Sequence, residues 1–178
     1  MIVSANRVAD LTSLDYYFER LRRRLDGLTD DEYLWEPVSP CISIEPGARG
    51  RAARVAPDGI DEFTTIAWRL CHIADLLREE RNWRWLGRTP ALLDAEMWQA
   101  PTASDAVGYV EEAFAAWSAL VASVSTDDWW LPMGPVAGPF ATSDRVAFVI
   151  HIMDELIHHG AEVALLRDLY RVRGHLTR

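Results

Sequence analysis

Residues 151–162 read His151-Ile-Met-Asp-Glu155-Leu-Ile-His158-His159-Gly-Ala-Glu162 and lie in a segment, from about Asp144 to Tyr170, whose apolar stripe predicts a long helix. At about 100° per residue, five polar side chains share one side of this helix: His151, Glu155, His158, His159 and Glu162. The apolar residues that overlap this sector are Ile152, Leu156, Val163, Leu166 and Tyr170. If this side of the helix is buried, a bound metal ion would satisfy several of the polar groups at once. The alternative is that this side of the helix faces solvent.

Glu155 and His159 are four residues apart, so a carboxylate and an imidazole share one helix face, with about 6 Å between their Cβ atoms. This spacing also arises by chance on solvated helices, so a distant third ligand is needed. His72 lies in an otherwise apolar segment, where a lone histidine is usually a hydrogen-bonded core residue. Because bundles build metal sites from facing helices, His72, Glu155 and His159 are the predicted ligands. His151 is the alternative to Glu155, which would then act as a base.

Three further segments have the apolar periodicity of helices: Val8 to Leu25, about Phe63 to Trp83, and about Ser104 to Val124. Thr29-Asp-Asp-Glu32 is a capping box, which predicts a short helical turn as far as Trp35. Residues 38–59 predict a long irregular loop between the first and second helices, with a small hairpin near residues 47–50. The sequence therefore predicts an all-α four-helix bundle, with residues 1–178 in a single domain.

Tryptophan residues are frequent in the predicted connections. The stretch Trp129-Trp-Leu-Pro-Met-Gly-Pro, between the third and fourth helices, is too rich in proline and glycine for regular structure. Its aromatic side chains either line the mouth of a pocket or close one end of the bundle. Trp83, Trp85 and Trp98 are expected to be exposed, and exposed apolar surface of this kind favours a homodimer.

The composition excludes several classes of function. With 49% hydrophobic residues, the chain can bury a core without disulfides, and its net charge of −9 opposes binding to nucleic acid or to an anionic membrane. Every basic residue is arginine, which excludes Schiff-base lysine chemistry and a lysine-containing phosphate loop. No targeting or membrane-spanning segment is evident, so a cytoplasmic location is expected, with Cys41 and Cys71 as free thiols and Cys71 packed in the core.

Two imidazoles and one carboxylate suit Zn²⁺, and Ni²⁺, Fe²⁺ and Mn²⁺ accept the same donors. A closed structural site usually has four protein ligands, so three ligands predict an open position for a water or a thiolate. Bound Zn²⁺ would lower the pKa of that group and provide a nucleophile near neutral pH. His151, His158 and Glu162 are then candidates to contact the ligands or to transfer protons.

Two segments resemble one known family. Thr-Ile-Ala-Trp-Arg-Leu-Cys-His-Ile-Ala around His72, and the fourth-helix stretch from Glu155 to Tyr170, are similar to the DinB-like superfamily, also called the DinB/YfiT-like metalloenzymes. The resemblance covers nearly the whole chain and implies a four-helix bundle with a metal between the second and fourth helices. Many members carry His-x-x-x-His in the last helix, whereas this chain has Glu155 at the first position, as mycothiol-dependent maleylpyruvate isomerases do. It thus implies the ligands His72, Glu155 and His159.

The resemblance also implies an activity. Its better-characterised members are transferases and isomerases that use mycothiol, bacillithiol or glutathione, with a metal that activates the thiol. The leading hypothesis is therefore a metal-dependent enzyme that brings a mycothiol-like thiol to an electrophilic substrate. The alternatives are a metal-dependent hydrolase, which needs no thiol, and a non-catalytic, stress-related bundle with a structural metal site.

Overall fold

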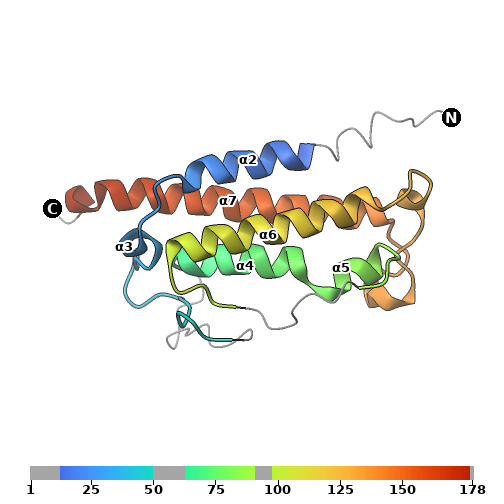
Figure 1. Ribbon diagram of the computed structural model, residues 1–178, viewed down its shortest axis with the longest axis horizontal. Coiled ribbons are helices and arrows are strands. Elements are labelled where there is room, and N and C mark those ends of the chain that lie inside the picture. The colour runs from blue at the N-terminus through green and yellow to red at the C-terminus, as the bar shows by residue number, and fades with distance from the viewer. Residues whose placement is uncertain (1–12, 50–62, 91–97, 177–178) are drawn as a thin grey trace.

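A computed structural model describes residues 13–49, 63–90 and 98–176 of the chain. Four long helices form a bundle (Figure 1): α2 (Ser13–Leu25), α4 (Ile66–Arg78), α6 (Ala103–Ala122) and α7 (Arg145–Leu176). α7 packs against both α2 and α4, and α6 packs against the same two helices, so the four close into a ring around one core. In Figure 1, α2 and α7 run in one direction and α4 and α6 in the other. The predicted all-α four-helix bundle is confirmed.

The core forms because each helix buries residues that recur every three or four positions. On α2 these residues are Leu14, Phe18, Leu21 and Leu25. Phe18 stacks on Phe114 of α6, with 3.8 Å between the ring centroids. In the part of the chain that the structure describes, no helix combines the length and apolar character needed to cross a membrane.

Threonine side chains fix where three helices begin. Thr29 accepts a hydrogen bond from the backbone N–H of Glu32 and starts α3 (Asp30–Tyr33), which confirms the predicted N-terminal cap and short helical turn, whereas the Glu32 carboxylate accepts hydrogen bonds from Arg167. Thr65 caps α4 in the same way, through the N–H of Trp68 at 3.2 Å, and Thr102 caps α6. The Thr65 cap fixes the start of the helix that carries His72.

The prediction of one continuous helix from Phe63 to Trp83 is wrong, because two helices, α4 and α5 (Glu80–Trp85), occupy this segment. The chain leaves helical geometry at Glu79, where φ is −55° and ψ is 132°, and resumes as α5. The buried Asn82 side chain donates hydrogen bonds to the carbonyls of Leu76 and Leu77, at 2.9 and 3.2 Å. The amide of Asn82 thus satisfies the last carbonyls of α4 and stabilises the break.

Other predicted boundaries either lie outside the described residues or differ from those in the structure. The start of the first helix and residues 50–62 of the predicted loop lie outside the described residues. The predicted hairpin near residues 47–50 continues into residues that lie outside the described part of the chain; within the described part, Arg49 forms an antiparallel bridge with Trp98. α7 continues to Leu176, beyond the predicted end at Tyr170, since its exposed last turns extend past the apolar stripe used to predict that end.

The tryptophan-rich connection contains two short 3₁₀ helices, η1 (Asp128–Trp130) and η2 (Pro135–Phe140), where no regular structure was predicted. Trp129 is buried in the core, whereas Trp130 is 40% exposed. The expectation that Trp83, Trp85 and Trp98 are exposed is wrong: Trp83 is buried and the other two are partly buried against the core. The break at Glu79 explains this for Trp83, because α5 turns it inward.

Candidate metal centre

The centre joins α4 to α7. His72 from α4 and Glu155 and His159 from α7 each offer a ligand atom, and these three atoms lie within 4.8 Å of one another. His159 Nε2 is 3.1 Å from Glu155 Oε2, one helical turn away. His159 is buried, whereas His72 and Glu155 are partly exposed. The packing of α4 on α7 therefore brings together the three residues that were predicted as ligands.

An aromatic contact holds His72 in place. The Trp68 ring, one turn earlier on α4, stacks on the His72 ring with 4.9 Å between centroids and 14° between planes. The His72 and His159 rings are nearly perpendicular, at 86°, with centroids 4.7 Å apart. Stacking restricts rotation of the His72 ring, so its nitrogens are preorganised relative to His159.

The other nitrogen of His159 contacts a carboxylate and an arginine. Glu162 Oε2 lies 2.7 Å from His159 Nδ1, and Arg69 Nε lies 3.0 Å from the same oxygen. Arg69 Nη1 is 3.2 Å from Nδ1. A nitrogen cannot donate to Glu162 and accept from Arg69 at once, and the shorter, charge-assisted contact to Glu162 favours a proton on Nδ1. Nε2 then keeps its lone pair on the side of Glu155 and His72.

The other two histidines of α7 lie at the edge of the cluster. His158 Nε2 is 3.3 Å from Glu162 Oε1, and the His158 side chain is 61% exposed. His151 Nδ1 is 3.9 Å from Glu155 Oε1, and the His151 side chain is 51% exposed. Among the described residues, a second group of three potential ligands contains His158, His159 and Glu162, and no such group contains His151. The geometry thus favours Glu155 over His151 as a ligand.

The donor atoms fit a divalent metal ion. Nitrogen and oxygen ligands bind Zn²⁺ at about 2.1 Å, so two donors of one tetrahedral ion lie about 3.4 Å apart. Glu155 Oε2 and His159 Nε2, at 3.1 Å, are close to this separation. The ligand atoms of the three residues are at most 4.8 Å apart, so side-chain movements of about 1 Å would bring the most distant pair to the 3.4 Å separation.

A profile of the DinB superfamily matches residues 14–163 of the chain. The chain belongs to the DinB superfamily. Proteins of this superfamily are generally metal-binding, and the match covers α2 from Leu14, all of α4 and α6, α7 as far as Val163, and the residues of the candidate centre. The resemblance to the DinB-like superfamily is thereby confirmed. No curated protein matches the chain in a sequence search.

Two residues of this DinB-superfamily site were not identified from the sequence. Trp68 and Arg69 lie four and three positions before His72 and contact the cluster, and Arg69 also lies over the Trp68 ring at 4.7 Å. A signal was present, because residues three and four apart on a helix share one face. Applying that spacing to His72, as was done for Glu155, identifies both.

Proposed function

We propose that this DinB-superfamily chain is a metal-dependent enzyme in which His72, Glu155 and His159 hold a divalent ion. The observation that carries the proposal is the convergence of these three side chains from α4 and α7, with ligand atoms within 4.8 Å. Zn²⁺ suits the donor set best, and Ni²⁺, Fe²⁺ and Mn²⁺ accept it as well. Three protein ligands leave a position for a further group.

The proposed substrate for that position is a low-molecular-weight thiol of the mycothiol type. Such a metal centre supplies a Lewis acid that lowers the pKa of a coordinated thiol. In S-transfer, the sulfur forms a bond to an electrophilic carbon, and the leaving group departs with the electrons of the bond that breaks. In isomerisation, the thiol adds to the substrate and is released again after the bond rotates. Glu155 in the last helix, shared with mycothiol-dependent isomerases, supports this choice.

The chain's own residues have separate roles in this proposal. Glu162 accepts a hydrogen bond from His159 and is held by Arg69, so these two residues orient a ligand. His158 and His151 are exposed beside the two carboxylates, where each can take the proton of the thiol and release it to water. Trp68 fixes the plane of His72. The electrophilic substrate approaches from the partly exposed side of Glu155 and His72.

The first test is the metal content of the purified chain and of three variants. Wild type is expected to contain about one equivalent of metal, and His72→Ala and His159→Ala are expected to lose it. His158→Ala is expected to retain the metal, and it distinguishes the proposed triad from the second group of potential ligands, His158, His159 and Glu162. Absence of metal from wild type after reconstitution with Zn²⁺, Ni²⁺, Fe²⁺ or Mn²⁺ would refute the proposal.

The second test separates thiol chemistry from the alternatives. Protein loaded with Co²⁺ is titrated with mycothiol, bacillithiol and glutathione, and thiolate coordination is expected to add a charge-transfer absorption band. The band should be absent when His72→Ala is treated in the same way. Turnover of esters or amides without added thiol would support a hydrolase instead, and metal-dependent stability without a thiol band or turnover would support a structural site.

A further inference from the structure

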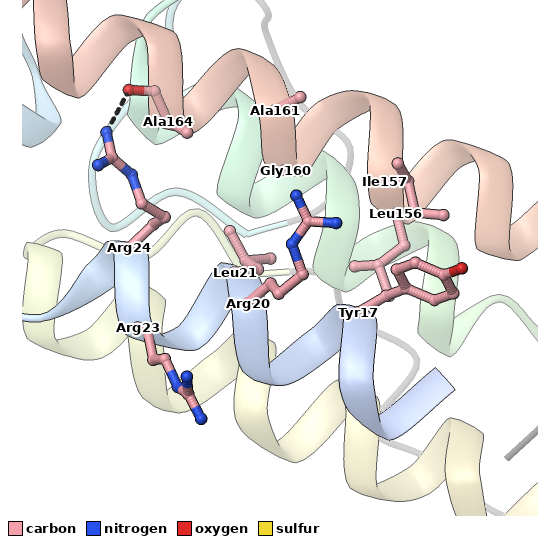
Figure 2. A pocket seen from close by; sticks show the side chains of 10 residues that line it. All are labelled: Tyr17, Arg20, Leu21, Arg23, Arg24, Leu156, Ile157, Gly160, Ala161 and Ala164. Atoms are coloured by element: carbon pink, nitrogen blue, oxygen red, sulfur yellow. Dashed lines mark hydrogen bonds between the residues drawn. The ribbon is translucent and has the colours of Figure 1, made fainter. Parts of the chain in front are cut away.

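A groove of about 420 Å³ lies between α2 and α7 (Figure 2). Its floor and walls are mostly apolar: Leu21, Leu156, Ile157, Gly160, Ala161 and Ala164. Arg20 extends from α2 toward α7 near the middle of the groove, with Tyr17 at one end and Arg24 at the other. The volume is within the range of small-molecule sites, about 300 to 1,000 Å³.

This groove is separate from the metal centre. At about 100° per residue, Ile157, Gly160 and Ala164 lie on the opposite side of α7 from Glu155. The two sites also use different partner helices, since α2 forms the other wall of the groove and α4 supplies His72. A ligand in the groove would therefore not contact the proposed metal ligands.

The charge of the groove differs from that of the whole chain. Three arginines border it although the net charge is −9. Two of them are paired: Arg23 with Glu19 at 3.0 Å, and Arg24 with Asp168 at 2.6 Å. Among the described residues, no carboxylate pairs with Arg20, whose guanidinium carbon lies 5.9 Å from the centre of the Tyr16 ring. Arg20 is thus a cation beside an apolar surface, which favours an anion with a hydrocarbon part.

Small residues on α7 give the groove its depth. A Cβ atom built on Gly160 would approach Leu21 to 3.8 Å, an ordinary van der Waals contact, so the packing would accept alanine there. Gly160 therefore leaves open a space that a side chain could fill. Leu21 and Leu156 at its base are buried, whereas Ile157 and Ala161 are exposed at its edge. The result is an apolar surface with access from solvent.

The geometry points to a binding site for an amphiphilic monocarboxylate, with its carboxylate on Arg20 and its hydrocarbon chain on Leu21, Leu156 and Ile157. The planar guanidinium of arginine matches a carboxylate in a bidentate arrangement. Because the groove is open on one side, about half of each methylene is buried. Each extension by two carbons is then expected to tighten binding about fourfold.

The test is calorimetric titration of the full chain with hexanoate, octanoate, decanoate and the neutral analogue decanol. Arg20→Gln is expected to weaken decanoate binding about tenfold or more and to leave decanol unchanged. Arg23→Gln is the matched control, because Arg23 is paired with Glu19 and points away from α7 in Figure 2. Ala161→Leu, which fills the groove, is expected to weaken both ligands.

Two results would overturn the inference. Decanol binding as tightly as decanoate, or Arg20→Gln binding decanoate as wild type does, would show that Arg20 does not recognise an anion. Absence of binding together with a concentration-dependent dimer that Ala161→Arg disrupts, measured by sedimentation, would assign the groove to a second copy of the chain. The exposed position of Arg20 on α2 means that Arg20→Gln is expected to fold, which its circular dichroism checks.

Discussion

Replacing Glu162 with alanine is expected to weaken metal binding about 10- to 100-fold without loss of the fold. The carboxylate is the hydrogen-bond acceptor for His159 Nδ1 at 2.7 Å, and Arg69 Nε lies 3.0 Å from the same oxygen. This arrangement favours a proton on Nδ1, so that the Nε2 lone pair, beside Glu155 Oε2, is available to a metal. The loss in affinity corresponds to about 1.4 to 2.7 kcal/mol, as expected for one charge-assisted hydrogen bond that is partly exposed.

The change has a second consequence for the tautomer of His159. Without Glu162, Arg69 Nη1, at 3.2 Å, is the polar neighbour of Nδ1 that remains among the described residues, and it can only donate. The proton of the neutral ring then moves to Nε2, where Glu155 Oε2 at 3.1 Å accepts it. Metal binding must first displace that proton. Glu162→Gln keeps an amide oxygen for Nδ1–H but loses the charge, so its affinity is expected to lie between those of wild type and Glu162→Ala.

Competition with a chromophoric chelator at fixed pH measures these affinities for the ion that the wild type retains. His158→Ala is the control, because it removes the exposed neighbour of Glu162 at 3.3 Å and is expected to change affinity less than threefold. The metal-free variants should melt within about 2 °C of wild type, since Glu162 is partly exposed. Affinity of Glu162→Ala within threefold of wild type would refute the proposed role in orienting His159.

Two further predictions concern stability and thiol reactivity. Arg167→Met is expected to lower the free energy of unfolding, measured by urea denaturation, by about 3 to 5 kcal/mol. The buried Arg167 donates to both oxygens of the buried Glu32, at 2.7 and 3.1 Å, so the substitution leaves a buried charge unpaired. Adding Glu32→Met should recover part of the loss, and a loss below about 1 kcal/mol would contradict the reasoning. Burial raises the pKa of the Cys41 thiol to about 11, so the thiolate fraction at pH 8 is about 100-fold below that of an exposed thiol. Alkylation of Cys41 by iodoacetamide, followed by peptide mass spectrometry, should therefore accelerate about tenfold per pH unit up to pH 10, and a plateau near pH 9 would disprove the shift.

Local signals predicted the helices, and tertiary contacts set what those signals missed. Apolar spacing and a threonine cap are properties of neighbouring residues, so the helix around His72 and the start at Thr29 followed directly from the sequence. The break at Glu79 depends on the side chain of Asn82, which satisfies the carbonyls of Leu76 and Leu77. No residue within the apolar pattern marks that position, because the signal is a buried hydrogen bond rather than a period.

The site was predicted less completely, for a geometric reason. The helical projection placed His151, His158 and His159 on one side of the helix but did not say where the core begins. In the structure, the core residues Ile152 and Val163 lie on the same side of Glu155 as His159, so His159 is buried. His151 and His158 lie on the other side of Glu155 and are exposed. A difference of about 80° to 100° around one helix thus separates a proposed ligand from the two exposed histidines.

The two proposed sites on α7 provide a mutual check on folding. The metal centre uses His72 and the side of α7 that faces α4, whereas the groove uses Arg20 and the side that faces α2. Substitutions at sites with no shared contacts usually have additive effects. A variant that loses metal but binds decanoate normally therefore retains the packing of α2 on α7, and loss of both ligands from one substitution indicates damage to the bundle. Each binding measurement thus separates a change in one site from a change in the fold.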